Sequence, residues 1–295
     1  MPFVTVDDGA RIYYKDWGID GSPVVLGHGW PLNSDAWEAA ALFLAEHGHR
    51  AVAHDRRGHG RSSQTWHGNE MDTYADDLAT VIETLDLSDI TLVGHSTGGG
   101  EAVRYLARHG SARVARLVLV SAVPPYMLRA DDNPDGIPAE VFDALRSGEL
   151  ADRSQLYRDL ADGPFFNHDR APVDQGFRDA FWAQSLGCGH RAAYECIAAF
   201  SATDFRPDLA AIDVPTLVIH GDADQIVPLD VGGRRTAELV DGAVLSVYEG
   251  GAHGLPDTSR ERLHDDLLAF VEGRPSRTNT QFRPPSTTKD GKGTP

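Results

Sequence analysis

The sequence predicts an α/β protein with a mostly parallel sheet that helices cover on both faces. Short, nearly continuous apolar runs at residues 23–29, 50–55, 90–96 and 114–122 alternate with segments of helical periodicity. Runs of this kind are typical of strands buried on both faces, and their alternation with helices is typical of parallel sheets. The 295 residues are enough for one large domain with an insertion, or for two small domains.

The first elements follow from their local patterns. Residues 3–6 and 12–17 alternate apolar and polar side chains around the turn sequence DDGA, which predicts an antiparallel hairpin. Residues 34–47 have helical spacing, and Ser34 is placed to cap that helix. Residues 72–87 form a second amphipathic pattern. Its apolar stripe consists of Tyr74, Leu78, Val81, Ile82 and Leu85.

The alternation of strands and helices stops after Val123, which indicates a helical lid inserted over the sheet. Helical patches replace the strand-like runs at residues 139–145, 154–160, 173–186 and 191–201. The core then resumes with a strand (214–224), a helix (232–240), a strand (243–250) and a last helix (259–271). The expected units are the N-terminal part of the core (1–123), the lid (124–211), the C-terminal part of the core (212–273) and a tail (274–295). The tail is rich in Pro, Ser, Thr, Arg and Lys, so we expect it to be disordered.

Composition narrows the classes of function. The formal net charge of −17 argues against binding to nucleic acid or to an anionic membrane surface, and it favours solubility. The two cysteines, Cys188 and Cys196, form no CxxC pair, which favours free thiols in a reducing compartment over a single disulfide. The N-terminus lacks the pattern of a signal peptide, and no apolar run approaches transmembrane length. We therefore expect a cytoplasmic protein.

The segment Gly94-His95-Ser96-Thr97-Gly98 lies between a predicted strand and a helix expected over residues 97–109. This G-x-S-x-G pattern places a serine on a tight, strained turn with its hydroxyl above the sheet, and glycine avoids a collision two residues before and after it. The helix N-terminus favours developing negative charge there. A glycine-rich turn with an incidental capping serine is the structural alternative, so a catalytic interpretation requires partner residues.

A serine nucleophile needs a histidine base, and the histidine needs a carboxylate to orient it. Asp222 and Asp224 follow one predicted strand, and His253 follows the last one, so the order serine, acid, histidine is met. The carboxyl ends of the strands are where such sheets place their catalytic groups. Asp224 is the better acid because it lies further out on its loop, whereas Asp222 is expected to hold the loop in place.

The alternative for His253 is a surface-loop histidine, one of 13 in the chain. The histidines are scattered and do not show the spacing of a metal site. An oxyanion also needs two N–H donors. The backbone N–H of Thr97, directly after the serine, is one candidate, and that of Trp30, after the strand ending in GHGW, is the other. Trp30 can at the same time be a packing side chain that lines the pocket.

Several segments carry a resemblance to a known family, including GHGWPLNSDAWE, HDRRGHGRSSQ, DTYADDLATVIETLDL, LVGHSTGGGEAVRYLARHG, VPTLVIHGDADQIVP and GGAHGL. They resemble the α/β-hydrolase subfamily of arylesterases and cofactor-free (non-haem) chloroperoxidases, also called perhydrolases. The resemblance spans about residues 3–271 and is thinner in the lid. It implies the α/β-hydrolase fold, a mostly parallel eight-stranded sheet with helices on both faces and an inserted helical lid.

The resemblance also implies a mechanism. Its triad is Ser96, Asp224 and His253, and its oxyanion hole is the backbone of Trp30 and Thr97, although many relatives have methionine at the position of Thr97. Peroxide would replace water in attacking the acyl-enzyme, and the resulting peracid would oxidise halide, with no cofactor and no metal. Pro31 matches the members named chloroperoxidases, and its fixed φ would shift the Trp30 carbonyl so that it helps to hold a peroxide molecule. The substrate pocket would be formed by Trp30, Pro31, Val123, Phe200, Ile226 and Val227.

Other functions stay open at this point. Dehalogenases and epoxide hydrolases of this fold have aspartate at the elbow, so Ser96 argues against both. Lactonases and carbon–carbon hydrolases share the triad, and a non-catalytic ligand-binding protein would use the same fold. The expected partners are a small ester, or a carboxylic acid plus peroxide. An apolar lid edge could support a homo-oligomer.

Overall fold

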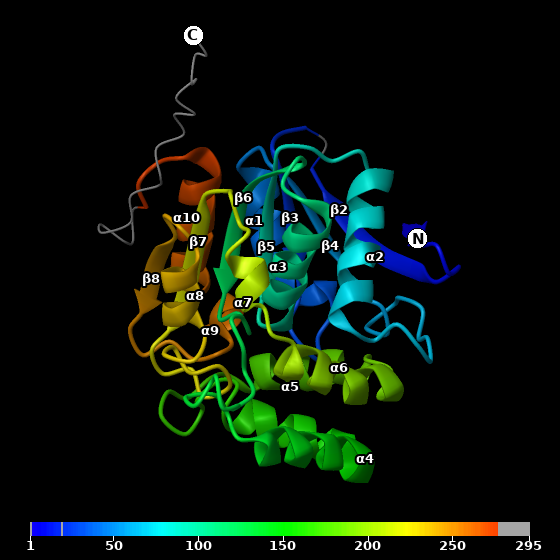
Figure 1. Cartoon of the computed structure of the whole chain (residues 1–295), viewed down its shortest axis with the longest axis vertical. Helices are drawn as coiled ribbons and strands as arrows, with labels where there is room; N and C mark the ends of the chain where they lie inside the picture. The colour runs from blue at the N-terminus through cyan, green and yellow to red at the C-terminus, as the bar shows by residue number, and fades with distance from the viewer. Residues whose placement is uncertain (1, 19, 277–295) are drawn as a thin grey trace.

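The computed structural model describes residues 2–18 and 20–276. Its centre is an eight-stranded sheet in the order β1-β2-β4-β3-β5-β6-β7-β8 (Figure 1). β1 and β2 form the predicted antiparallel hairpin, β2 runs antiparallel to β4, and all later pairs are parallel. The fold class predicted from the sequence is confirmed. The strands are β1 (Phe3–Thr5), β2 (Arg11–Trp17), β3 (Pro23–Gly27), β4 (Arg50–His54), β5 (Ile90–His95), β6 (Val114–Val120), β7 (Thr216–Gly221) and β8 (Val244–Tyr248).

Helices cover both faces of the sheet because neighbouring residues of the buried strands point to opposite sides. On β3, Val24 and Leu26 pack into one apolar cluster with α1 and α10, whereas Val25 packs into the other with α2 and α3. The short helix α7 packs against α3 on that second face, and α8 lies next to α7 (Figure 1). These helices are α1 (Glu38–Glu46), α2 (Met71–Thr84), α3 (Thr97–His109), α7 (Arg206–Leu209), α8 (Gly233–Leu239) and α10 (Arg260–Glu272).

Of the four helices between β6 and β7, three lie beyond one end of the sheet, where the longest packs against the other two (Figure 1). They are α4 (Ala139–Asp162), α5 (Gln175–Leu186) and α6 (His190–Ala202). The two helical patches expected at 139–145 and 154–160 belong to one helix, α4, which is kinked where Asp152 leaves helical geometry with φ −158° and ψ 84°. We call residues 124–211 the lid, as in the sequence analysis.

The cap expected at Ser34 is wrong, and one short helix was not predicted. The segment at 34–47 begins with a 3₁₀ helix, η1 (Ser34–Trp37), and its cap is Asn33, whose side chain accepts a hydrogen bond from the Asp35 N–H at 2.9 Å. Ser34 instead donates its hydroxyl to Asp55 Oδ1 at 2.6 Å. The last helix is preceded by a short one, α9 (Leu255–Thr258), which directly follows the loop of His253. In the first case, a polar partner distant in the sequence, Asp55, accepts the Ser34 hydroxyl.

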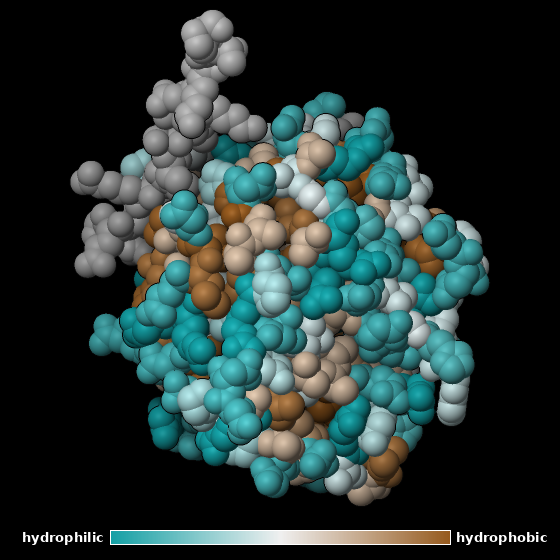
Figure 2. Space-filling model, in the orientation of Figure 1, coloured by the Kyte–Doolittle hydropathy of each residue, from teal (hydrophilic) through white to brown (hydrophobic). Residues whose placement is uncertain are grey.

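The surface agrees with the acidic composition. The face in Figure 2 is dominated by hydrophilic residues, and its hydrophobic residues form separate small patches. Within residues 2–18 and 20–276, no helix is long and apolar enough to cross a membrane. The two cysteines are free and fully buried, and burial raises the pKa of both thiols, that of Cys196 to about 11. The tail predicted at 274–295 lies outside the described residues from position 277 onward.

Candidate active site

Ser96 sits on a strained turn between the end of β5 and the start of α3. Its φ of 52° and ψ of −119° lie in a region that residues with side chains rarely adopt. Close backbone packing maintains the turn: a Cβ on Gly94 would lie 2.3 Å from the Gly98 carbonyl oxygen, and one on Gly98 would lie 2.4 Å from the Gly27 carbonyl oxygen. Both glycines of the motif are therefore required by space, as the sequence pattern predicts.

Asp224 and His253 form a buried pair across the loops after β7 and β8. His253 Nδ1 lies 2.8 Å from Asp224 Oδ2. The other carboxylate oxygen, Oδ1, accepts the backbone N–H groups of Ile226 and Val227, each at 2.9 Å. These contacts fix the carboxylate so that it orients the imidazole, leaving Nε2 as the free nitrogen.

The environment of Asp224 keeps it ionised. Burial disfavours the charged carboxylate, but the charge and hydrogen bond of His253, with a further contribution from His220, hold the pKa of Asp224 below its usual value. His220 Nε2 lies 3.5 Å from Asp224 Oδ2. Asp224 is therefore a carboxylate at neutral pH and can stabilise an imidazolium on His253.

Asp222 has a different position, although it is only two residues away. Its Oδ1 accepts the N–H of Gly250 at 2.7 Å, which ties the loop after β7 to the loop after β8. The loop-holding role expected for Asp222 agrees with this hydrogen bond. Asp224, by contrast, is the carboxylate that reaches His253.

His95 connects the serine turn to the histidine loop. Its Nε2 lies 3.0 Å from the backbone carbonyl oxygen of His253. Burial, reinforced by the neighbouring His253, lowers the pKa of His95 to about 3, so the ring is neutral and donates from Nε2. His95, directly before Ser96, thus fixes the backbone of His253.

Trp30 and Thr97, the residues that carry the candidate oxyanion donors, line the same cavity. Thr97 is the first residue of α3, where N–H groups lack partners within the helix, and Trp30 follows β3 in the neighbouring loop. A buried network holds that loop: Arg56 donates to the His28 carbonyl oxygen at 2.6 Å and to Glu101 Oε2 at 2.8 Å. Burial opposes ionisation of Glu101, but Arg56 and His54 outweigh it and lower its pKa to about 2.

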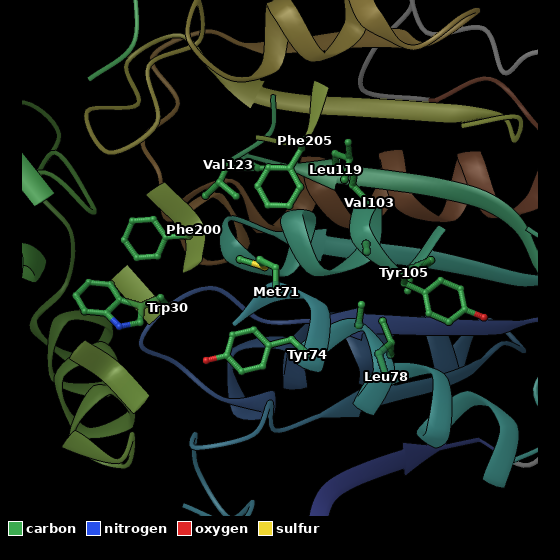
Figure 3. Packing of buried hydrophobic residues seen from close by; sticks show 14 of the residues in the cluster. Trp30, Met71, Tyr74, Leu78, Val103, Tyr105, Leu119, Val123, Phe200 and Phe205 are labelled. Carbon is green, nitrogen blue, oxygen red and sulfur yellow. The ribbon is translucent and has the colours of Figure 1, made fainter. Parts of the chain in front are cut away.

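A cavity of about 380 Å³ lies between these groups and the lid. Ser96, Thr97, Trp30 and His253 contribute to one side of it. Its remaining wall is almost entirely apolar and consists of Val123, Met127, Ile137, Val141, Phe142, Leu145, Leu160, Pro164, Phe165, Phe181, Phe200, Gln225, Ile226, Val227 and Pro228. Figure 3 labels three of the lining residues, Trp30, Phe200 and Val123, within the buried hydrophobic cluster. Such a cavity suits an uncharged ligand whose one reactive group faces Ser96.

A family model described as the alpha/beta hydrolase fold matches residues 22–258. The chain belongs to the α/β-hydrolase family. It is 52% identical over 274 residues to a non-heme haloperoxidase of Rhodococcus erythropolis, covering 92% of this chain and 100% of that protein. It is 49% identical over 274 residues to a bifunctional esterase/perhydrolase of Acinetobacter calcoaceticus, covering 92% and 99%. The crystal structure of a bromoperoxidase from Bacillus anthracis matches with a TM-score of 0.88 and 39% identity, covering 92% and 99%. The resemblance predicted from the sequence is confirmed.

The cavity of this hydrolase departs from the predicted pocket in one residue. Trp30, Val123, Phe200, Ile226 and Val227 line it as expected. Pro31 does not, although it too lies in the described part of the chain. The reason is a tight turn, closed by the Leu32 N–H on the Gly29 carbonyl oxygen at 3.0 Å, in which Pro31 is buried away from the cavity.

Apart from Phe200, the cavity walls that the lid provides were not predicted from the sequence. Phe165 packs against the ring of His253 with centroids 5.4 Å apart, and its carbonyl oxygen accepts the Gly254 N–H at 2.9 Å. Phe181 packs on Phe165 in turn, at 4.3 Å. Helical periodicity indicates an apolar face on each lid helix, but it does not show which face lies over Ser96. Among residues 2–18 and 20–276, no group of three or more His, Cys, Asp or Glu side chains is arranged to hold a metal ion.

Proposed function

We propose that this protein is a serine hydrolase that cleaves small carboxylic esters, aryl esters among them, through an acyl-enzyme. The proposal is carried by one observation: the buried Asp224–His253 pair opens into the same apolar cavity as Ser96 on its strained turn. Ser96 would be the nucleophile, His253 the general base and Asp224 the residue that orients it.

Each step follows from the positions of these groups. The Ser96 hydroxyl attacks the ester carbonyl carbon while His253 Nε2 takes its proton, and the N–H groups of Trp30 and Thr97 bind the oxyanion that forms. The intermediate collapses, the imidazolium returns the proton to the leaving alcohol, and the acyl group stays on Ser96. Water activated by His253 then attacks the acyl-enzyme and releases the carboxylic acid.

The same machinery supports a second outcome. When hydrogen peroxide attacks the acyl-enzyme in place of water, the product is a peracid and free Ser96. The peracid then oxidises halide to hypohalous acid and becomes the carboxylic acid, so no cofactor takes part. The names of the relatives, a non-heme haloperoxidase and a bifunctional esterase/perhydrolase, support this side activity. Pro31 would act through the Trp30 carbonyl that precedes it, because its ring does not reach the cavity.

The compartment and the partners of the protein are part of the proposal. Two buried free thiols and an acidic surface favour a cytoplasmic protein that acts on a small ester, or on a carboxylic acid plus peroxide. The charge argues against nucleic acid and membrane partners, and an apolar lid edge such as Leu150, which is 64% exposed, is suited to contact a second copy.

Ser96→Ala tests the nucleophile. We expect turnover of a short-chain aryl acetate to fall about 10⁶-fold, with an unchanged melting temperature, because only the attacking oxygen is removed. Ser121→Ala is the matched control: Ser121 is also a buried serine at a strand end with positive φ (43°), but it does not line the cavity, so it should retain activity.

A second assay on the same variants addresses perhydrolysis. Wild type given peroxide, acetate and bromide should produce a halogenating oxidant, and Ser96→Ala should not. A folded wild type that cleaves no ester would contradict the esterase assignment, whereas ester cleavage without oxidant would remove the perhydrolase activity alone.

A further inference from the structure

The side chain of Trp30 belongs to a core loop but is held by the lid. Its indole Nε1–H donates to the backbone carbonyl oxygen of Ala193 on α6 at 3.0 Å. Its ring packs against Phe200 of α6, with centroids 5.7 Å apart, and against Tyr157 of α4, at 6.1 Å and an interplanar angle of 76°. Two lid helices therefore determine where the indole lies.

Tyr157 stands behind Trp30 as seen from the cavity. Phe200 lines the cavity together with Trp30, whereas Tyr157 does not. Tyr157 is completely buried and presents its ring in an edge-to-face contact to the indole. Because Tyr157 lies outside the cavity wall, its contact with the indole is the route by which it can influence the reacting atoms without touching the substrate.

The position of Tyr157 is fixed by Glu149 on the same helix. The Tyr157 hydroxyl donates to Glu149 Oε1 in a short hydrogen bond. Residues eight positions apart on a straight α-helix are separated by about 12 Å along its axis, too far for this contact. The kink at Asp152 brings the two side chains together. The Glu149 carbonyl oxygen also accepts from His190 Nε2 at 2.6 Å, which ties α4 to the first residue of α6.

A buried carboxyl group at this place is costly to the fold. Glu149 is 1% exposed, burial raises its pKa, and its Oε2 has no hydrogen-bond partner within the described chain. The nearby Arg153 lies over the Tyr157 ring at 5.4 Å, but it donates to backbone carbonyls such as that of Cys188, at 2.7 Å. An apolar side chain at position 149 would avoid this cost. What Glu149 provides instead is a fixed acceptor for the tyrosine behind Trp30.

We propose that Tyr157 and Glu149 are positioning residues for the oxyanion hole. Through their hydrogen bond at the kink of α4, they hold the Trp30 ring, and thereby the backbone N–H of Trp30, in register with Ser96. The inference rests on the proposed esterase function and names a lid contribution to transition-state binding. The lid then does more than enclose the substrate, because a correctly placed α4 is needed for one of the two oxyanion donors.

Substitutions on α4 measure this contribution. We expect Tyr157→Phe, which keeps the ring but loses its anchor, to lower kcat for an aryl acetate about tenfold with little change in KM. This loss is smaller than the ~10²–10³-fold fall in kcat that follows complete removal of an oxyanion donor, because the donor is displaced and not removed. Glu149→Leu should behave like Tyr157→Phe. Glu149→Gln retains an acceptor for the Tyr157 hydroxyl and should restore most of the activity.

A double-variant cycle separates positioning from a general structural role. In a Trp30→Phe background the indole N–H and the larger ring are already lost, so adding Tyr157→Phe should lower kcat no further. Trp182→Phe is the control: Trp182 also donates to α4, to the Ser154 carbonyl oxygen at 3.1 Å, but it neither contacts Trp30 nor lines the cavity. It should keep kcat within about twofold, as expected for positions outside such a network.

The outcomes are distinct. If wild type cleaves the ester, Ser96→Ala does not, and Tyr157→Phe retains full kcat, the positioning role is wrong while the esterase function stands. Equal, additive losses in both backgrounds would also overturn it, because they would show that Tyr157 acts independently of Trp30. A rise in KM alone would assign Tyr157 to substrate binding instead. If the folded wild type has no esterase activity, the proposed function is wrong, and the positioning role that rests on it falls as well.

Discussion

The two sides of the cavity are built on different principles. On the core side, polar groups are held by dense hydrogen bonding: Asp224 Oδ1 alone accepts two backbone N–H groups while Oδ2 contacts His253. On the lid side, the wall is formed by apolar side chains such as Phe142, Leu145 and Phe181. The core therefore determines which reaction occurs, and the lid mainly determines which molecule fits. The Glu149–Tyr157 pair is the exception, since it carries a lid effect to the core.

Within the core, the largest expected difference in kcat is between variants of two aspartates. Asp224→Asn should lower kcat by about 10³–10⁴-fold, because an amide cannot stabilise the imidazolium and favours the wrong tautomer of His253. Asp222→Asn keeps an acceptor for the Gly250 N–H, so it should cost about 1 kcal/mol of stability or less and little activity. Steady-state kinetics of both purified variants on one aryl acetate make the comparison. If Asp222→Asn were the more damaging change, the acid would be reassigned.

Glycine-to-alanine substitutions compare the packing of the two regions. A Cβ at Gly98 would lie 2.4 Å from the Gly27 carbonyl oxygen and 2.8 Å from that of His28, so α3 must shift and carry Ser96 with it. We expect Gly98→Ala to lose about 1–3 kcal/mol of stability and most of the activity. Gly176 on α5 of the lid has no atom within 4 Å of such a Cβ, so Gly176→Ala should gain about 0.5–1 kcal/mol.

Urea denaturation and ester turnover, measured on the same preparations, check both glycine variants. An unchanged Gly98→Ala enzyme would show that the turn at Ser96 tolerates displacement of α3. A destabilised Gly176→Ala variant would show that the lid is packed as tightly at this position as the core.

The smallest expected effect concerns selectivity. Leu145 on α4 is half-buried and lines the cavity, so Leu145→Ala enlarges the lid wall at small cost to the fold. The ratio of kcat/KM for octanoyl over acetyl esters should rise about tenfold, the scale of one or two methylene contacts. kcat for the acetyl ester should stay near that of wild type. A series of 4-nitrophenyl esters measures the ratio. An equal loss of kcat/KM for every ester in the series would show that Leu145 supports the reaction itself and does not determine which acyl chain fits.

The candidates on the core side come from local signals in the sequence. Ser96 directly follows β5, Asp224 and His253 lie in the loops after β7 and β8, and parallel strands bring their ends together. The lid could not be predicted in the same detail. The kink at Asp152 and the contact of Phe165 with His253 depend on how helices dock on the sheet, which periodicity does not encode. The cap at Asn33 was missed because Asp55, distant in the sequence, binds Ser34.

The burial of the two cysteines has a consequence for durability. A protein that releases a peracid is exposed to its own oxidant, and the thiolate is the form of cysteine that oxidants attack. Cys188 and Cys196 are fully buried with raised thiol pKa values, so both are protonated and shielded at neutral pH. Their oxidation then requires local opening of the contact that α6 and the loop before it make with the core, where Cys188 Sγ lies 3.6 Å from the Gly58 carbonyl oxygen. The working lifetime of the catalyst would thus depend on how often that contact opens.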